Sequence, residues 1–189
     1  MSHLKSHIEP LEYIVYPPHG VGQIQAIEEQ EVAGYNLKLY VIHFVRDKMY
    51  VKVPVAKASE LGLRRLSDKK HIEQAMDVLY SKAKVKRTMW SRRAQEYETK
   101  INSGDIVSIA EVVRDLFKID SHLTQSYSER QLYETALDRL CREVSLVQGK
   151  DLDGVIKQVE SYLEEIRLTK SKSLMQPTID SEGSVAVAS

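Results

Sequence analysis

The sequence predicts an α+β protein in which a small N-terminal β-barrel of the Tudor or SH3 type is followed by an all-α helical bundle domain. Up to about residue 60, apolar residues occur in short runs with a period of two, and beyond it they recur with a period of 3.6. Turn-forming sequences separate the runs. We expect a disordered extension over residues 1–10, the β-domain over 11–60, the helical domain over 61–170 and a disordered tail over 171–189.

Four or five short strands are expected in the β-domain, too few for a sandwich and typical of a strongly bent sheet or a small barrel. The clearest strand is KMYVKV (48–53), in which Val51 alternates with the outward Lys48, Tyr50 and Lys52. That outward row is either a protein-docking face or a set of solvated side chains. The other strands are predicted at 12–16, 23–29 and 37–45, with turns at 17–22, 33–34 and 46–47.

Five apolar stripes with helical spacing predict five helices in the second domain. Ser128 and Gln131 have the spacing of a capping box, and Gly149 is expected to end that helix. Because the loops are short, we expect a compact bundle. The helices are predicted to begin near Ser67, Thr88, Asp105, Ser128 and Asp151, with Thr88 and Asp105 as N-caps.

Composition and charge are those of an ordinary soluble protein. The 189 residues include 27 basic and 27 acidic ones, so the net charge is zero, and 42% of the residues are hydrophobic. The N-terminus lacks the apolar segment of a signal peptide, and no apolar run approaches the roughly 18 residues of a membrane span. The single cysteine, Cys141, excludes an internal disulfide framework. We expect a cytoplasmic protein in which Cys141 packs in the core.

Residues that carry catalysis, cofactor binding or metal binding do not converge in the sequence. There is no glycine-rich phosphate loop, zinc-ligand pattern or nucleophile elbow. His3 and His7 have i, i+4 spacing but lack a third ligand. We therefore expect no enzymatic activity, no cofactor, no metal and no small-molecule substrate.

The most polarised segment is the run at residues 82–93, which holds six basic residues and no acidic one. Trp90, the only tryptophan, lies in this run at a predicted helix start, where few residues of its own helix would bury it. Cations such as Arg92 and Arg93 are slightly unfavourable in a first helical turn, which suggests a partner outside the fold. DNA phosphates would suit such a cluster. The commoner alternative is a solvated face with a tryptophan that anchors the helix to the core.

Four motifs occur in order along the chain: VYPPHGVGQIQAIE (15–28), MYVKVP (49–54), TMWSRRAQEYETKINSGD (88–105) and IAEVVRDLF (109–117). Together they resemble the CarD/CdnL family of bacterial RNA polymerase-binding regulators. The resemblance extends from about residue 12 to residue 165 without a large gap. Each motif alone would be weak, but the ordered set is highly specific.

For the first domain, the resemblance implies a Tudor-like unit that binds the β subunit of RNA polymerase. The polymerase-facing positions correspond to Gln30 and Lys52 at the centre, with Glu28, Tyr50 and Val51 nearby. Members of the family often carry arginine at both central positions. Gln30 cannot make a bidentate charged contact and Lys52 makes a weaker one, so we expect weaker docking or a different β-subunit surface.

For the second domain, the resemblance implies contact with promoter DNA at the upstream edge of the transcription bubble, with little sequence specificity. Trp90 would wedge into the minor groove at the melted junction. Four basic residues would hold phosphates: Lys86, Arg87, Arg92 and Arg93. Gln95 stands where a basic residue is common.

Such a factor would stabilise the promoter open complex without a catalytic group, and it would associate with the nucleoid through the polymerase. The alternative is a polymerase-bound protein adaptor of the same fold. In that case Trp90 is a core residue and the basic run binds another protein.

Overall fold

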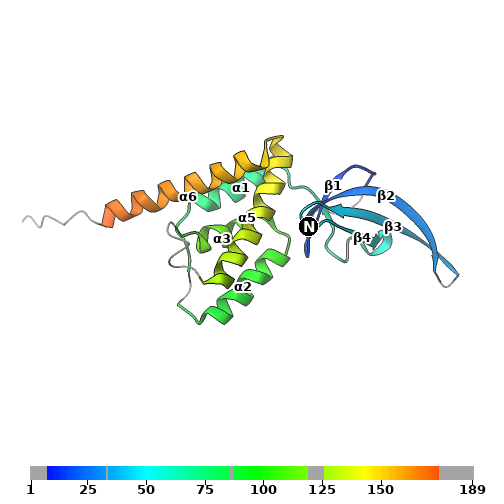
Figure 1. Cartoon of the computed structure of the whole chain (residues 1–189), viewed down its shortest axis with the longest axis horizontal. Coiled ribbons are helices and arrows are strands. Elements are labelled where there is room, and N and C mark those ends of the chain that lie inside the picture. Colours follow the sequence, from blue (N-terminus) through cyan, green and yellow to red (C-terminus); the bar gives the residue numbers. More distant parts are fainter. Residues whose placement is uncertain (1–7, 33, 86, 119–125, 175–189) are drawn as a thin grey trace, which may run out of the picture.

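The computed structural model describes residues 8–32, 34–85, 87–118 and 126–174. The β-domain lies at one end of an elongated molecule and the helical bundle at the other (Figure 1), which confirms the α+β fold class. The strands are β1 (Tyr13–Tyr16), β2 (Gly20–Val32), β3 (Tyr35–Phe44), β4 (Met49–Pro54) and β5 (Arg64–Arg65), with a 3₁₀ turn at Val55–Lys57. The helices are α1 (Lys69–Tyr80), α2 (Trp90–Asn102), α3 (Ile106–Leu116), α5 (Tyr127–Gln148) and α6 (Leu152–Leu174).

The strands form one antiparallel sheet in the order β4-β3-β2-β1-β5. Among the described strands β4 and β5 are the edges, so the sheet is open. β5 lies within residues 61–170, where the sequence analysis placed the helical domain, and it pairs with β1 through Ile14↔Arg65 and Val15↔Arg64. The sheet therefore extends beyond residue 60.

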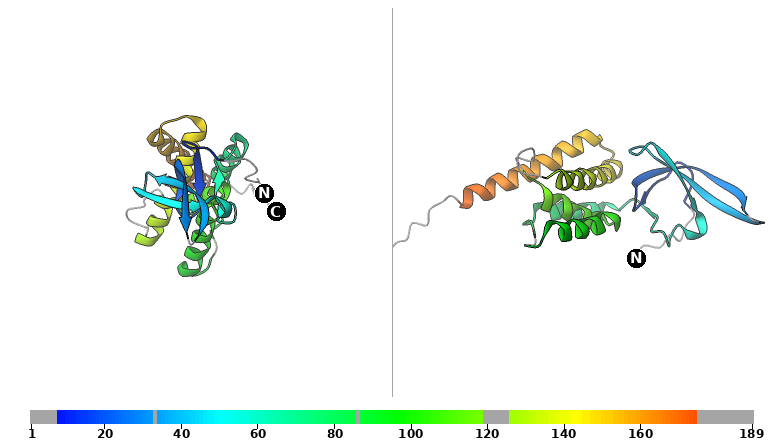
Figure 2. Two further views of the ribbon diagram at one scale, coloured as in Figure 1. Left: turned by 90° about the vertical axis from the view of Figure 1, so that its right-hand side faces the viewer. Right: turned by 60° about the horizontal axis from the view of Figure 1, so that its bottom comes forward.

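Strands β2 and β3 form a long hairpin that projects away from the rest of the molecule (Figure 2). Tyr40 and Ile42 of β3 belong to the core of the β-domain. Because side chains alternate along a strand, Leu39 and Val41 lie on the opposite, outer face. Of the predicted turn at residues 33–34, residue 33 lies outside the described residues, and Gly34 lies in the turn.

Side-chain caps set the starts of several helices. Asp105 accepts a hydrogen bond from the Ser108 amide at 2.8 Å and caps α3 as predicted. Thr88 does not cap α2, because the N-cap position belongs to Met89, which makes no side-chain cap hydrogen bond.

The capping box of α5 lies two residues before the predicted one. Ser126 Oγ accepts from the Glu129 amide at 3.3 Å, and Glu129 accepts from the Ser126 amide at 3.2 Å. Two pairs with the same spacing overlap here, and the pair with a carboxylate is favoured because an anion is stabilised at a helix N-terminus. Gly149 ends α5 in a left-handed conformation, as predicted.

Each domain has its own apolar core. Ile8 is fully buried in the β-domain, so that part of the predicted extension belongs to the domain, whereas residues 1–7 lie outside the described residues. Helix α6 continues through residues 171–174 of the predicted tail, and residues 175–189 lie outside the description. Cys141 is buried in the helical core, where burial raises the pKa of its thiol to about 12. No helix in the described ranges is long and apolar enough to cross a membrane.

A buried carboxylate on α5 joins the two domains. Glu143 is only 2% exposed and accepts hydrogen bonds from both terminal nitrogens of Arg64, at 2.8 and 2.9 Å. The Ser67 amide donates to the same carboxylate at 2.8 Å. Arg64 also donates to the Gly104 carbonyl, at 3.0 Å from Nε and 2.6 Å from Nη2. One side chain of the sheet is thus bonded to two parts of the helical domain.

A second arginine fixes the turn between β1 and β2. Arg139 of α5 donates to the carbonyl of Pro17 at 2.6 Å and to that of Pro18 at 2.7 Å. Gly104 has φ +70°, and a Cβ there would lie 2.9 Å from Pro17 Cγ, so only glycine permits this approach. We call the set formed by Pro17, Arg64, Gly104, Arg139 and Glu143 the interdomain joint.

Candidate functional site

The first candidate site is the outer face of the sheet, where four residues of the predicted docking set lie together. Lys52 Nζ on β4 donates to Glu28 Oε2 at 2.6 Å, and Gln30 Nε2 donates to the same oxygen at 3.2 Å. Tyr50 stacks on His43 of β3, with ring centroids 4.5 Å apart and the rings 21° from parallel. We call the surface of Glu28, Gln30, Tyr50 and Lys52 the strand face.

Val51, the fifth residue of the predicted docking set, is not on this face. It pairs with Ile42 of β3, and its side chain packs against the core of the β-domain. The alternation along β4 that puts Tyr50 and Lys52 outside puts Val51 inside. Its side chain is therefore unable to contribute to contacts made by the strand face.

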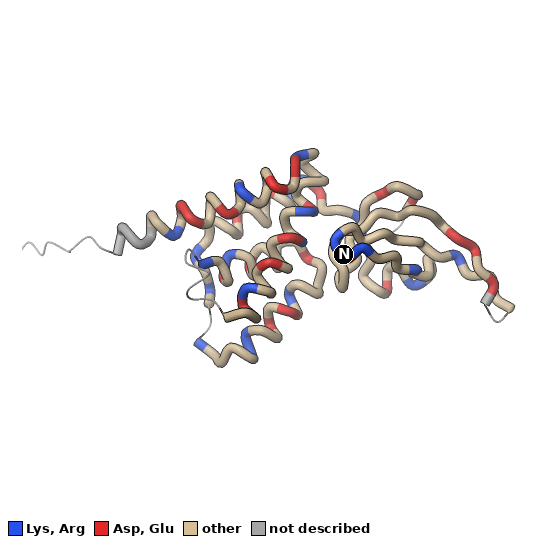
Figure 3. Tube along the Cα trace, in the orientation of Figure 1, with Lys and Arg blue, Asp and Glu red and all other residues tan. Residues whose placement is uncertain are grey.

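The second candidate site is the start of α2, which we call the basic corner and define by Arg87, Trp90, Arg92 and Arg93. Arg87 and Arg92 are exposed, as phosphate contacts require. Basic residues recur along the linker and the first turns of α2 (Figure 3). Lys86 lies outside the described residues. The structure thus brings three of the four predicted cations together with Trp90.

Trp90 is half-buried between α2 and α5. Its Nε1–H donates to Ser128 Oγ at 3.0 Å, and its ring lies 6.4 Å from that of Tyr97. The ring also packs against the helical core. Few residues of its own helix bury Trp90, and the start of α5 supplies further contacts, as in the alternative of a tryptophan that anchors the helix to the core.

Arg93 also has partners within the fold. Its guanidinium lies 5.4 Å from the Trp90 ring centroid, and Nη2 is 3.8 Å from Glu129 Oε1. Lys118 Nζ contacts the same carboxylate at 3.1 Å. Burial raises the pKa of Glu129, but the Ser126 amide, Lys118 and Arg93 outweigh it and hold the pKa below its ordinary value. Arg93 therefore has partners within the fold, and of the described cations of the basic corner Arg87 and Arg92 are the exposed ones.

The lowered pKa of Glu129 predicts a pH-dependent contribution to stability. A carboxylate with a depressed folded-state pKa stabilises the fold above its unfolded-state pKa of roughly 4.3, and this stabilisation is lost as the pH falls through the folded value. We expect wild type to melt at a higher temperature than Glu129→Gln at pH 7, with the difference shrinking toward pH 3. Glutamine can occupy the same position of the capping box, so the variant removes the charge and keeps the cap. A difference that is constant from pH 7 to pH 3 would contradict the assignment.

A buried ion pair on α3 holds the linker that leads to the basic corner. Asp115 Oδ1 accepts from Arg114 Nε at 2.8 Å and from the Lys84 amide at 3.0 Å. Arg114 Nη1 donates to Ser81 Oγ at 2.6 Å. Arg114 and Asp115 both lie in the motif IAEVVRDLF, but no role was predicted for them from the sequence. The signal was available, because two adjacent charged residues interrupt an apolar helix in IAEVVRDLF.

The two sites present groups that suit contact with the surface of a partner. Among the described residues, no group of three or more His, Cys, Asp or Glu side chains could hold a metal ion. The strand face presents stacked rings and a paired charge, and the basic corner presents exposed cations. The fold defines a two-domain protein with one candidate contact surface on each domain.

Comparison with known proteins identifies its family. The family model described as the CarD C-terminal domain matches residues 74–160, and that described as the CarD-like/TRCF RID domain matches residues 9–67. A Bacillus subtilis (strain 168) protein named "Putative transcription factor YdeB" is 31% identical over 149 residues, which cover 79% of this chain and 95% of YdeB. The chain belongs to the CarD family. It is a non-enzymatic regulator, as the sequence predicted.

A solved structure is also similar in sequence to the first domain. The 72-residue N-terminal domain of Myxococcus xanthus CarD, determined by solution NMR, is 30% identical over 34% of this chain and 93% of that domain. The TM-score is 0.25, so the family assignment rests on the two family models and on YdeB.

Proposed function

We propose that the protein is a transcription regulator that binds the β subunit of RNA polymerase with the strand face and contacts promoter DNA with the basic corner, thereby stabilising the open complex. The match to the CarD-like/TRCF RID domain and the name of YdeB support a role in transcription at the polymerase. The two sites supply the chemistry: a mixed polar and aromatic face for a protein, and exposed arginines for phosphates.

The observation that carries this proposal is the interdomain joint. The contacts of Glu143 with Arg64 and of Arg139 with Pro17 and Pro18 fix the strand face and the basic corner in one unit. When the first domain docks on polymerase, the second is held near DNA at an effective concentration on the order of millimolar. Specificity then comes from the position of the polymerase, and the DNA contact needs no base readout.

The effect on promoter melting follows from differential binding. Inserting a side chain into a closed duplex costs a few kcal/mol of unstacking per step, and that cost is lower where the bubble has already distorted the duplex. Trp90 is already ordered by Ser128 and Arg93, so little side-chain entropy is lost on contact. The open complex is stabilised only by the difference in binding free energy between open and closed DNA. A difference of about 1.4 kcal/mol shifts the melting equilibrium tenfold.

The packing of Trp90 also favours a second candidate, the polymerase-bound adaptor. The indole N–H already has a partner in Ser128, and the ring rests against the helical core. In this alternative Trp90 maintains the fold of the basic corner, and Arg87 and Arg92 contact a protein instead of DNA.

The lifetime of heparin-challenged open complexes on a ribosomal RNA promoter tests the proposal, using the cognate RNA polymerase. We expect wild type to lengthen the lifetime. Lys52→Glu should abolish the effect, because a second carboxylate beside Glu28 would leave uncompensated negative charge in the strand face. Trp90→Ala and Arg92→Ala should reduce it. Arg92 is exposed, so its variant should melt like wild type. Lys157→Ala, at an exposed lysine on α6, is the matched control and should leave the lifetime unchanged.

The outcomes separate the two candidates. If wild type binds polymerase but does not lengthen the lifetime, the adaptor replaces the open-complex stabiliser. If Trp90→Ala lowers the melting temperature and the lifetime while Arg92→Ala leaves the lifetime intact, Trp90 acts through the fold and the DNA contact is rejected.

A further inference from the structure

The hairpin carries an apolar stripe that continues the strand face. On β3, Tyr35, Leu37, Leu39 and Val41 all lie on the outer side of the sheet, because Tyr40 and Ile42 point to the core. Leu39 and Val41 are buried, Leu37 is 37% exposed and Tyr35 is 74% exposed. We call these four residues the apolar stripe. It begins beside the strand face and runs outward along the hairpin.

Strand pairing places the stripe against the strand face. Leu37 is opposite Gln30, and Leu39 is opposite Glu28 on β2. On the other side, Val41 is opposite Lys52 on β4. Polar residues of the strand face therefore border the stripe on both sides.

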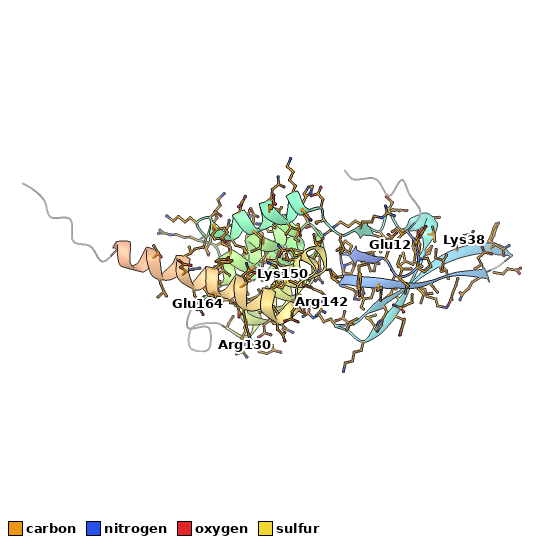
Figure 4. The ribbon with its side chains drawn as sticks, turned by 90° about the horizontal axis from the view of Figure 1, so that it is seen from above. Glu12, Lys38, Arg130, Arg142, Lys150 and Glu164 are labelled. Carbon is orange, nitrogen blue, oxygen red and sulfur yellow. The ribbon has the colours of Figure 1, made fainter. Side chains whose placement is uncertain are left out.

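The charges of the hairpin are kept away from the stripe. Lys38 pairs with Glu29 at 3.1 Å, and by alternation both lie on the face opposite the stripe. Lys38 lies far out along the hairpin (Figure 4). On the stripe side, Lys52 and Glu28 neutralise each other at 2.6 Å. This side of the hairpin thus presents apolar groups with no net charge.

We propose that the apolar stripe is the main polymerase-docking element of this chain and that it takes an apolar, weakly charged patch of the β subunit. This inference rests on the proposed function. Tyr35 and Leu37 supply the exposed contact area, and removing apolar surface from water favours binding in proportion to the area buried. The Glu28–Lys52 pair sets the orientation and contributes little affinity, because its charge is already compensated. Docking is then largely independent of salt.

Continuity and area favour polymerase over a second copy of the chain as the occupant. Tyr35 and Leu37 are the exposed part of the stripe, and two side chains expose far less than the roughly 800 Å² per partner that a stable dimer buries. The two side chains adjoin Gln30, Lys52 and Tyr50, so they enlarge the strand face. In the proposed function, RNA polymerase binds that face.

Binding of the full-length protein to purified cognate RNA polymerase core enzyme, measured by fluorescence anisotropy at 50 and 500 mM salt, tests the inference. We expect Tyr35→Ser/Leu37→Ser to bind at least about tenfold more weakly than wild type. The matched control is Asn36→Ser/Lys38→Ser, which changes the alternate positions of the same strand and should bind like wild type. Raising the salt should weaken wild-type binding by less than about threefold. All variants should keep the wild-type melting temperature, since the side chains are exposed.

Three results would overturn the inference. The first is wild-type affinity in the stripe variant, and the second is a tenfold or larger loss of wild-type affinity at 500 mM salt. The third is sedimentation of wild type as a dimer that the stripe variant abolishes, which would make a second copy the occupant. Absence of any wild-type binding to polymerase would instead overturn the proposed function itself.

Discussion

Replacing Asp115 by alanine is expected to lower the free energy of unfolding by about 4 kcal/mol, because removing one partner of a buried ion pair leaves the other charge uncompensated. The side chains of Asp115 and Arg114 are only 4% and 5% exposed. The substitution also removes the acceptor of the Lys84 amide, which ties the linker between α1 and α2 to α3. For a chain of this length, 1 kcal/mol corresponds to about 2–4 °C, so the melting temperature should fall by more than about 8 °C.

A more exposed ion pair between α2 and α3 provides the control. Lys100 and Glu111 lie 2.6 Å apart, but their side chains are 36% and 31% exposed, so Glu111→Ala should cost less than about 1 kcal/mol. If urea titrations gave equal losses of unfolding free energy for Asp115→Ala and Glu111→Ala, burial of the ion pair would not determine the size of the loss. Asp115→Asn should fall between them, because the amide oxygen can still accept from Lys84.

Glu143→Ala is expected to cost about 3 kcal/mol and to uncouple the two domains. Glu143 is almost completely buried and accepts three hydrogen bonds that originate in Arg64 and Ser67. The cost is smaller than for Asp115 because Arg64 is partly exposed and water can solvate it once its partner is gone. The variant should bind polymerase with wild-type affinity but lengthen open complexes less, since its two contact surfaces are no longer held at a fixed separation.

Thermal melting and the two functional assays check this prediction together. Glu134→Ala on the same helix is the control, because Glu134 is exposed and lies 3.8 Å from Arg130 in a surface pair. If Glu143→Ala melts several degrees lower yet keeps the full open-complex lifetime, the joint stabilises the protein without positioning its surfaces.

Local patterns in the sequence were sufficient for strands β1 to β4, for the five described helices and for several of their ends, whereas β5 was not predicted. The period-two alternation in KMYVKV correctly separates Val51 from Tyr50 and Lys52. The Asp105 cap was predictable because its partner is only three residues away. These features depend on neighbours within one turn or one strand, and such neighbours are visible in any single sequence.

Contacts between distant segments could not be predicted in this way. The sequence left open whether Trp90 is exposed or anchors the helix, because its partner Ser128 is 38 residues away on another helix. Glu143 resembles any glutamate on an amphipathic helix until Arg64, 79 residues earlier, is placed beside it. The family resemblance implied positions for docking and for DNA contact, but only the packing of α2 on α5 showed that Arg93 lies beside Glu129 within the fold.

The joint between Arg139 and the prolines has a consequence for protein engineering. The guanidinium on α5 recognises the carbonyls of Pro17 and Pro18, and Gly104 leaves room for the Pro17 ring. The two halves of the chain are therefore not interchangeable modules. A chimera that takes its first domain from another homologue needs a β1–β2 turn that fits Arg139 and Gly104. Without such a turn, its two domains will fold as separate units connected only by the linker.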